Sequence, residues 1–528
     1  MLHRATITPT VTSLYDRCTI AAIAVAISLA MTAVAAAQTT LHVPAEYATI
    51  QQAIDAASDG DEILVAPGTY VETINYSGKT LALRSTSGHE VTIIDAQQPE
   101  TTPVVRIIGG SGKGTVLDGF TITGGTGLKG SFTFGGGLFV ENAHLAIVGC
   151  HITGNTANAG GGLAASSGAQ LVVSGSYFSS NHASGGGAGV MVHNSSSASF
   201  VDCVFSNNVG HPETSWGGGA LLQENAAAEF TNCHFEGNTA FIGGGVYLGI
   251  DAIADFHSCD LVGNVGTWTG GGAIIRFGAA PTFIACRFEN NIALNGAGGG
   301  VNISQDGAAY FDDCQFIGNE APAGGGAFVI LNTVASFANC LFDSNIALTA
   351  GGGVRVRLDG IANFTECSFI GNHAPSGGGV NFNMNTSADF FSTLFQGNTA
   401  DDGGAMKVDS TGVASLSGSE VLANFASATA GGILVDKGGS LQVADTTVCD
   451  NTPNNLIGDT VNIGGNAICV DCSTPADLNC DAVVNVFDLL ILLEQWGTCT
   501  VPGDCHADLN GDGVVNVFDL LTLLENWG

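Results

Sequence analysis

Two acidic loops near the C-terminus carry the side chains best suited to chemistry. Each loop places Asp or Asn at positions 1, 3, 5, 9 and 12 of a twelve-residue segment, and the second loop starts 31 residues after the first. The first set is Asp477, Asn479, Asp481, Asn485 and Asp488, and the second set is Asp508, Asn510, Asp512, Asn516 and Asp519. Calcium prefers about six to eight oxygen ligands supplied by a loop with this spacing. The sequence therefore predicts two Ca²⁺ sites.

The charge and the turn residues of this region refine that prediction. Nine acidic residues and no Lys or Arg lie between Ser473 and Gly528, so without a cation the region repels itself. Gly513 stands at position 6 of the second loop, where the backbone must turn sharply, but Ala482 replaces it in the first loop. We therefore expect the first site to bind Ca²⁺ more weakly than the second.

A helix-like pattern follows each loop. The pattern is Asp-Leu-Leu-x-Leu-Leu-Glu-x-Trp-Gly, at 488–497 and 519–528. This duplicated arrangement resembles the type I dockerin, a calcium-folded module that docks enzymes onto cohesin scaffolds. For residues 473–528 the resemblance implies Ca²⁺ and a cohesin-type partner. The positions that select the cohesin hold Val486-Phe487 and Val517-Phe518, and no basic pair follows the helices, which departs from the family pattern. The alternative is a calcium-stapled cap that only shields the end of the main body.

A repeat of about 27 residues fills most of the chain. An Asn follows each of eight cysteines by five residues, and Ser or Thr takes the Cys position in further copies. The cysteines are Cys150, Cys203, Cys233, Cys259, Cys286, Cys314, Cys340 and Cys367. Twelve intervals separate Phe120 from Thr446, which gives a mean period of 326/12 residues. Periods of this length are typical of solenoids.

The other repeated positions indicate what kind of solenoid this is. Phe recurs three residues before and two residues after the Cys position, and these two files hold 16 of the 28 Phe. A Gly run and then an alternating strand such as 354–358 follow each Asn turn. Three short strands and three turns per repeat predict an all-β parallel β-helix whose coils stack at ~4.8 Å. Phe, thiol and Asn ladders would then run along its interior, with the Asn amides bonded to one another.

Two family resemblances support this fold. The Phe-x-x-Asn and Gly-Gly-Gly-apolar signatures resemble the repeats of chlamydial polymorphic outer membrane proteins, which form right-handed β-helices. The opening segments 43–51 and 65–70 resemble the first coil of the pectin-lyase-like superfold. That resemblance implies a single-stranded right-handed parallel β-helix over 38–466, with a short capping helix at 50–57.

Polar side chains gather at the outward positions of the strand that follows the Gly run. These positions are apolar in the first coils and polar in the later ones. Three successive coils bring together Arg355, Asn381 and Lys407, with Arg357, Asn383 and Asp409 beside them. In a chain with 13 bases, this concentration predicts a binding face for an acidic polysaccharide. The alternative is a solvated strand face with compensating charges.

Composition and the N-terminus bear on the location and the partners of the protein. The net charge of −34 argues against a nucleic-acid partner, because little basic surface is left to neutralise phosphate. Arg4 and Arg17 precede an apolar run that ends in Ala35-Ala36-Ala37, which predicts a signal peptide at 1–37 and a secreted or cell-surface protein. The alternative is a single membrane anchor. Outside the cell, six cysteines near the C-terminus could form disulfides, with the pairing left open.

These observations lead to two hypotheses of function. The favoured one is a monomeric, calcium-binding extracellular β-helix protein, which acts as an adhesive or carbohydrate-binding module and attaches to a partner through residues 473–528. The alternative is a polysaccharide-degrading enzyme, either a pectate-lyase-like enzyme or a glycoside hydrolase of a cellulosome-like system. The sequence names no catalytic residue. The nearly constant turn lengths favour the first hypothesis, because active sites on such scaffolds are built from long loops.

Overall fold

The chain forms a long β-solenoid and a small helical module. The structure is a computed structural model, and it describes residues 39–97, 102–109, 112–128, 133–469, 476–478, 483–498 and 507–528. The expected signal peptide at 1–37 lies outside these residues. No helix within the described ranges is long and apolar enough to cross a membrane.

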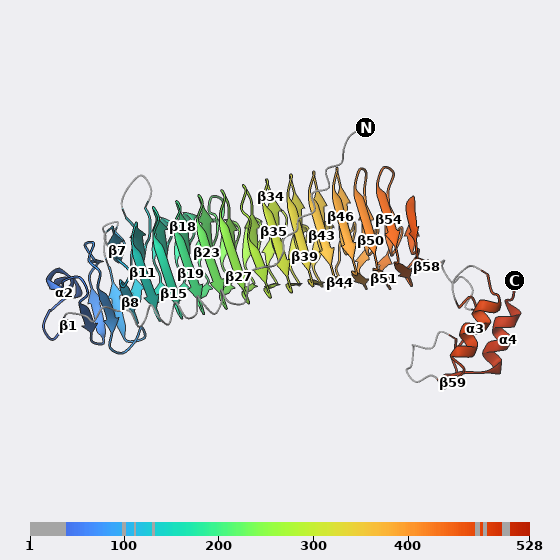
Figure 1. Cartoon of the computed structure of the whole chain (residues 1–528), viewed down its shortest axis with the longest axis horizontal. Coiled ribbons are helices and arrows are strands. Elements are labelled where there is room, and N and C mark those ends of the chain that lie inside the picture. The colour runs from blue at the N-terminus through green and yellow to red at the C-terminus, as the bar shows by residue number, and fades with distance from the viewer. Residues whose placement is uncertain are drawn as a thin grey trace.

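Along residues 144–357, each coil passes in turn through four parallel sheets, which we call A, B, D and C (Figure 1). Among the described residues, sheet A has 17 strands, from β1 (Thr40–Val43) to β57 (Thr460–Gly464), and sheet B has 16, from β3 (Gly68–Val71) to β58 (Ala467–Ile468). In the same part of the chain, sheet C has 15, from β4 (Ile74–Asn75) to β56 (Leu456–Ile457), and sheet D has 8, from β13 (Thr156–Ala159) to β41 (Ile346–Ala350). The predicted right-handed parallel β-helix is confirmed.

Sheets C and D position the candidate site. The other strands of sheet C are β7 (Val105–Ile108), β10 (Leu138–Glu141), β14 (Leu163–Ser166), β18 (Val190–His193), β22 (Ala220–Gln223), β26 (Val246–Leu248), β30 (Ala273–Ile275), β34 (Val301–Ser304), β38 (Ala327–Ile330), β42 (Val354–Arg357), β45 (Val380–Asn383), β49 (Met406–Val408) and β53 (Ile433–Val435). The other strands of sheet D are β17 (His182–Gly186), β21 (Val209–Gly210), β25 (Thr239–Ile242), β29 (Val265–Thr269), β33 (Ile292–Ala293) and β37 (Glu320–Ala323).

Sheet D corrects the expectation of three strands per coil. The segment after each Asn, expected to be a turn, pairs with its equivalents in the neighbouring coils along the middle of the solenoid. In β13 and β17, for example, Thr156 lies opposite His182 and Ala157 opposite Ala183. These strands are two to five residues long, too short to show a periodic pattern. They form because each coil offers the next one the same extended backbone to pair with.

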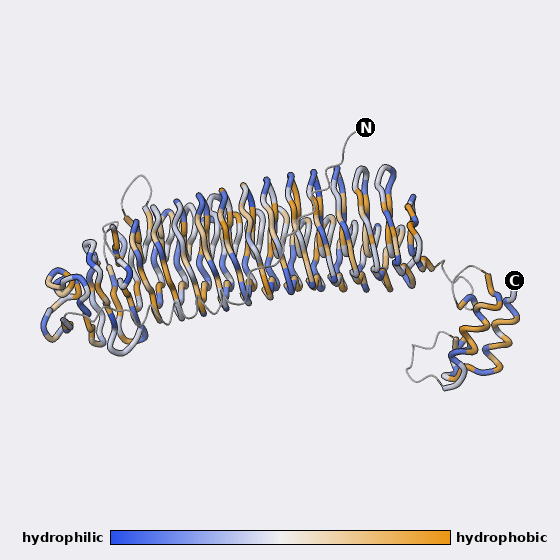
Figure 2. Tube along the Cα trace, in the orientation of Figure 1, coloured by the Kyte–Doolittle hydropathy of each residue, from blue (hydrophilic) through white to orange (hydrophobic). Residues whose placement is uncertain are grey.

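Stacked identical side chains fill the interior. The rings of Phe283, Phe311 and Phe337 are parallel to within 8°, with centroids 4.8–5.0 Å apart, and all three are at most 1% exposed. Eight cysteines of the repeat are free and buried in the same core. Such close packing of aromatic rings adds to the free energy gained from burial alone. Figure 2 shows how apolar and polar residues alternate around each coil.

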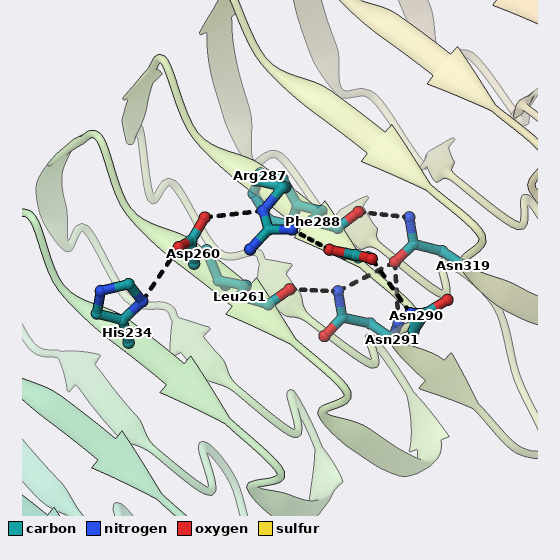
Figure 3. Close-up of polar contacts among 9 residues, drawn as sticks. His234, Asp260, Leu261, Arg287, Phe288, Asn290, Asn291 and Asn319 are labelled. Carbon is teal, nitrogen blue, oxygen red and sulfur yellow. Dashed lines mark hydrogen bonds and ion pairs between the residues drawn. The ribbon is translucent and has the colours of Figure 1, made fainter.

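The Asn ladder is also confirmed. Asn291 donates from its side-chain Nδ2 to the Asn319 Oδ1 at 3.0 Å and to the Leu261 carbonyl at 2.7 Å (Figure 3). The Asn291 backbone N–H also donates to the Asn319 Oδ1, at 3.0 Å. The same pattern continues to Asn345 in the next coil. The column therefore satisfies turn backbone that is fully buried.

Glycine is required where the chain turns from sheet D into sheet C. Gly324 has a φ of +61°, which L side chains rarely adopt. A Cβ on Gly325 would lie 2.5 Å from the Gly352 carbonyl oxygen of the next coil. The Gly runs thus allow successive coils to approach one another closely.

A short helix covers the N-terminal end of the solenoid. Helix α2 (Ile50–Ala56) begins after Thr49, whose hydroxyl accepts the Gln52 N–H, and it buries Ile50, Ala53 and Ile54. Lys79 donates to three carbonyls at its C-terminus, including that of Ile54 at 2.8 Å. The expected capping helix at 50–57 is therefore present, because a cap, an apolar face and a cation at its C-terminus all favour it.

The C-terminal module contains two equivalent helices. Helices α3 (Val486–Glu494) and α4 (Val517–Glu525) each begin with a capping box, formed by Asn485 with Asp488 and by Asn516 with Asp519. A small core of its own holds Ala476, Val484, Leu492, Ala507, Val515 and Leu523, in which the second three follow the first three by 31 residues. The strands β59 (Gly497–Thr498) and β60 (Val514–Val515) pair antiparallel. The sequence duplication is therefore a structural one.

Candidate functional site

The six residues predicted to form a binding face lie together on the outer surface of sheet C. Strands β42, β45 and β49 run parallel and in register, so that Arg355, Asn381 and Lys407 form one row. Arg357 lies opposite Asn383 in a second row, and Asp409 directly follows β49. The fold therefore brings the six side chains together as expected.

Hydrogen bonds and ion pairs connect one half of this cluster. Lys407 Nζ lies 3.3 Å from Asp402 Oδ2, 3.6 Å from Asp409 Oδ1 and 3.4 Å from Asp436 Oδ2. Asn381 Nδ2 donates to Asp409 Oδ2 at 3.2 Å and to Ser376 Oγ at 3.1 Å. Burial acts to lower the pKa of Lys407, but the three carboxylates outweigh it and raise that pKa. Lys407 is therefore a firmly protonated ammonium at neutral pH.

The two arginines form the other half and lack such partners. Arg355 donates from Nη1 to Thr349 Oγ1 at 3.4 Å, and neither Arg355 nor Arg357 has an ion pair among the described residues. The Nε atoms of both are buried without a hydrogen-bond partner in that part of the chain, as are the Oδ1 atoms of Asn381 and Asn383. Burial lowers the pKa of Arg355, and the Arg357 guanidinium lowers it further. The guanidinium groups nevertheless stay charged at neutral pH.

The structure corrects one property of this face, its exposure. The side chains were expected to project into solvent, but Asn381 is 1% exposed and the Lys407 side chain 13%. The reason is the chain between the Asn turn and the Gly run, which packs along the outer face of sheet C. In the earlier coils this contact is a second apolar core, in which Met191, Leu221, Tyr247 and Ile274 pack against Phe134, Ala159 and Ile242.

Comparison with known families identifies the solenoid. The family model of the right-handed β-helix region matches residues 104–249 and 218–400, which together span 297 of the 528 residues. The chain belongs to the right-handed β-helix family. No curated protein sequence matches it.

Two residues at the edge of sheet D, which bond to the polar residues of sheet C, were not found from the sequence. Ser376 and Asp402 directly precede Gly runs, and each contacts the outward residue five positions later, Asn381 and Lys407 respectively. The same spacing joins the Ala297 carbonyl to Asn302 at 3.3 Å. A polar residue just before the Gly run, followed by a polar residue five positions on, is thus the signal that would have found them.

A second charged row of the β-helix lies on sheet B and is fully paired. Arg287 Nε donates to Asp260 Oδ1 at 3.0 Å, and its Nη1 contacts Glu289. His234 Nδ1 lies 3.1 Å from the other Asp260 oxygen (Figure 3). The hydrogen bond that Arg287 donates to Asp260 raises the pKa of Arg287. This row satisfies its own charges, unlike Arg355 and Arg357.

The acidic loops stay a prediction as metal sites. In the second loop, Asp508 accepts the backbone N–H groups of Gly511, Asp512 and Gly513 at 2.7–3.1 Å. Asp519 is fully buried and accepts the Asn510 N–H at 3.1 Å. Within the described ranges no three His, Cys, Asp or Glu side chains converge as a metal site. In the first loop, Asn479, Asp481 and Ala482 lie outside the described residues.

The structure shows the disulfide pairing of two of the six C-terminal cysteines. Cys449 and Cys469 form a disulfide in the last coils of the β-helix. Cys472, Cys480, Cys499 and Cys505 lie outside the described residues. One pair of the six expected disulfide-forming cysteines is therefore assigned.

Proposed function

We propose that the protein is an exported carbohydrate-binding β-helix whose sheet C outer face binds an acidic polysaccharide. β-Helix proteins are commonly carbohydrate-related or adhesive. The observation that carries the proposal is a set of four buried polar atoms, on Arg355, Arg357, Asn381 and Asn383, that have no hydrogen-bond partner among the described residues. Each such atom costs about 1–3 kcal/mol when left unsatisfied. A polysaccharide brings hydroxyl groups that donate and accept, and its carboxylates pair with guanidinium groups.

Removal of the two arginines tests this proposal. The double variant Arg355→Ala with Arg357→Ala should lose retention on immobilised pectate or alginate, because both free guanidinium groups are gone. Circular dichroism should stay unchanged, since neither arginine has an ion pair in the described structure. Arg287→Ala is the matched control on sheet B and should bind normally. Unaltered retention of the double variant would contradict the proposal.

The proposal extends to the C-terminal module as a calcium-dependent attachment domain. Residues 473–528 would bind two Ca²⁺ ions and dock onto a cohesin-type scaffold protein. The duplicated core and the two capping boxes support a common design for both halves.

Calorimetry of the full chain should detect two Ca²⁺ ions of different affinity. Asp519→Asn should remove one of them, and Ala482→Gly should strengthen only the weaker one. Binding of fewer than two ions by the unaltered chain would defeat this part.

An elimination reaction on the same polysaccharide is the second candidate function. Arg355 would be its base, because burial and the neighbouring Arg357 lower the pKa of this guanidinium, and the reaction would then need alkaline pH because the group is charged at neutral pH. The firmly protonated Lys407 is unsuited to that role. Incubation with pectate or alginate, with and without Ca²⁺, should release unsaturated uronides if the protein is a lyase. Polymer that is bound but left intact would favour the non-catalytic function.

A further inference from the structure

A small hollow lies on the solenoid between sheet D and the outer face of sheet C. Its volume is about 260 Å³. Trp268 and Thr269 of β29 line one side, and Asn302 and Ser304 of β34 line the other, with Arg276 at its rim. It sits three strands of sheet C before Arg357, because Arg276 directly follows β30. None of these residues belongs to the predicted binding face.

Asn302 contributes a built polar group. It is 5% exposed, and its Nδ2 donates to Thr269 Oγ1 at 2.8 Å and to the Ala297 carbonyl at 3.3 Å. These two bonds fix the amide so that Oδ1 is the free atom. That oxygen has no hydrogen-bond partner in the described structure. A buried acceptor held in this way can accept a hydrogen bond from a ligand.

Arg276 contributes a positive charge that has no ion pair in the described structure. Its Nη2 contacts the Gln305 Oε1, and its Cζ lies 4.2 Å from the centre of the Phe277 ring. Its Nε is buried without a partner, and no carboxylate among the described residues pairs with it. Burial lowers the pKa of this guanidinium, which nevertheless stays charged at neutral pH. The guanidinium therefore keeps donors that are not bonded in the described structure, and an incoming anion would accept from them.

Trp268 contributes a half-exposed aromatic surface. The indole is 50% exposed, and Phe241 stacks beside it with ring centroids 6.2 Å apart. Trp side chains are enriched at binding interfaces, because the ring is apolar and the indole N–H is a hydrogen-bond donor. The hollow thus combines an aromatic face, one anion-binding group and one buried hydrogen-bond acceptor.

We propose that this hollow binds a single uronic acid ring, with Arg276 on the carboxylate, Asn302 Oδ1 accepting a hydroxyl proton and Trp268 against the sugar ring. The volume is below the roughly 300–1,000 Å³ typical of sites for drug-sized ligands, which suits one ring rather than an oligosaccharide. The assignment rests on the proposed function for its ligand class. It adds to that function a subsite that recognises one sugar unit of the polymer.

Titration of the full chain with galacturonic acid tests the subsite, with galactose as the neutral counterpart. Galacturonic acid should change the tryptophan fluorescence and bind at least about 10-fold more tightly than galactose, the ratio expected for one charge-assisted contact. Arg276→Gln should remove the difference between the two sugars. Trp268→Phe should abolish the fluorescence response, and this exposed substitution leaves the core intact. Arg287→Gln, an ion-paired arginine on sheet B, is the matched control.

The outcomes separate this inference from the proposed function. Equal binding of the two sugars by the unaltered protein, no binding of either, or an unchanged preference in Arg276→Gln would each overturn the subsite. If the protein is retained on pectate but does not bind galacturonic acid, only the subsite is contradicted. If galacturonic acid binds but the protein is not retained on the polymer, the extended binding face is contradicted and the subsite stands.

Discussion

The outer face of sheet C differs between its first and its second half, although its inner face does not. In the first half, Met191, Leu221, Tyr247 and Ile274 occupy one outward row and are at most 5% exposed. In the second half, Arg355, Asn381 and Lys407 continue the same row. The inward residues of both halves are apolar, as in β22 and β42, and fully buried.

The inward residues of each coil determine the fold, whereas the outward residues of sheet C differ from coil to coil. The inner ladders stack without interruption, so a change in the outer row leaves the register intact. Where the outer row is apolar, sheet D packs on it as a second core. Where the row is polar, the same packing leaves polar atoms of Arg355 and Asn381 buried without a partner in the part of the chain that the structure describes. A stabilising contact in one half thus becomes a candidate binding surface in the other.

The largest effect should come from the inner ladder, whichever half it lies in. Phe311→Ala should lower the free energy of unfolding by about 3–5 kcal/mol, because it removes a fully buried ring stacked on both neighbours. Tyr310→Ala is the matched control on the same strand, since its side chain points outward and is 43% exposed. Denaturant unfolding measures both. Similar losses for the two variants would show that the inner face has no special role.

The next effect should distinguish the two halves of the outer row. Tyr247→Ala should cost about 3 kcal/mol, because this ring is 2% exposed and stacks on Trp216 at 5.5 Å. Arg355→Ala should change stability by no more than about 0.5 kcal/mol, since it breaks no ion pair of the described structure. Thermal unfolding of the two variants measures the difference. A larger loss for Arg355→Ala would mean that the polar half is a structural element.

Much of the solenoid could be predicted because the residues that determine each coil lie close together in the sequence and recur in every repeat. The Cys and Asn positions fix the register of every coil, and the Asn ladder follows once Asn291 and Asn319 are stacked. Helix α2 was expected from the resemblance of the opening segments to the first coil of a known β-helix fold, and the structure adds its capping residue Thr49. The six polar residues of the later coils could be placed on one face because strands alternate with a period of two.

Burial of the outer face could not be predicted, because it depends on how sheet D lies against sheet C. The short segment 239–242, for example, carries no period that distinguishes a strand from a turn. Its Ile242 nevertheless packs on the apolar outer row. The hollow at Arg276 was missed for the same reason, since Trp268 and Asn302 come from different sheets and meet only after the coils are stacked.

A third effect, smaller than the difference between Tyr247→Ala and Arg355→Ala, should come from Lys407 and should depend on pH. Lys407→Ala should cost about 1 kcal/mol at neutral pH, because Asp402, Asp409 and Asp436 would then repel one another without compensation. Since the folded state raises the pKa of Lys407, its contribution is complete below 10.5, the ordinary value, and is lost as pH rises through the folded pKa. The stability difference between the two proteins should therefore vanish in strong alkali. Lys437→Ala, which removes an exposed neighbour on the next coil, is the matched control and should change stability by no more than about 0.5 kcal/mol. A difference that stays constant across this pH range would mean that the ammonium charge of Lys407 is not what holds the polar half of the face together.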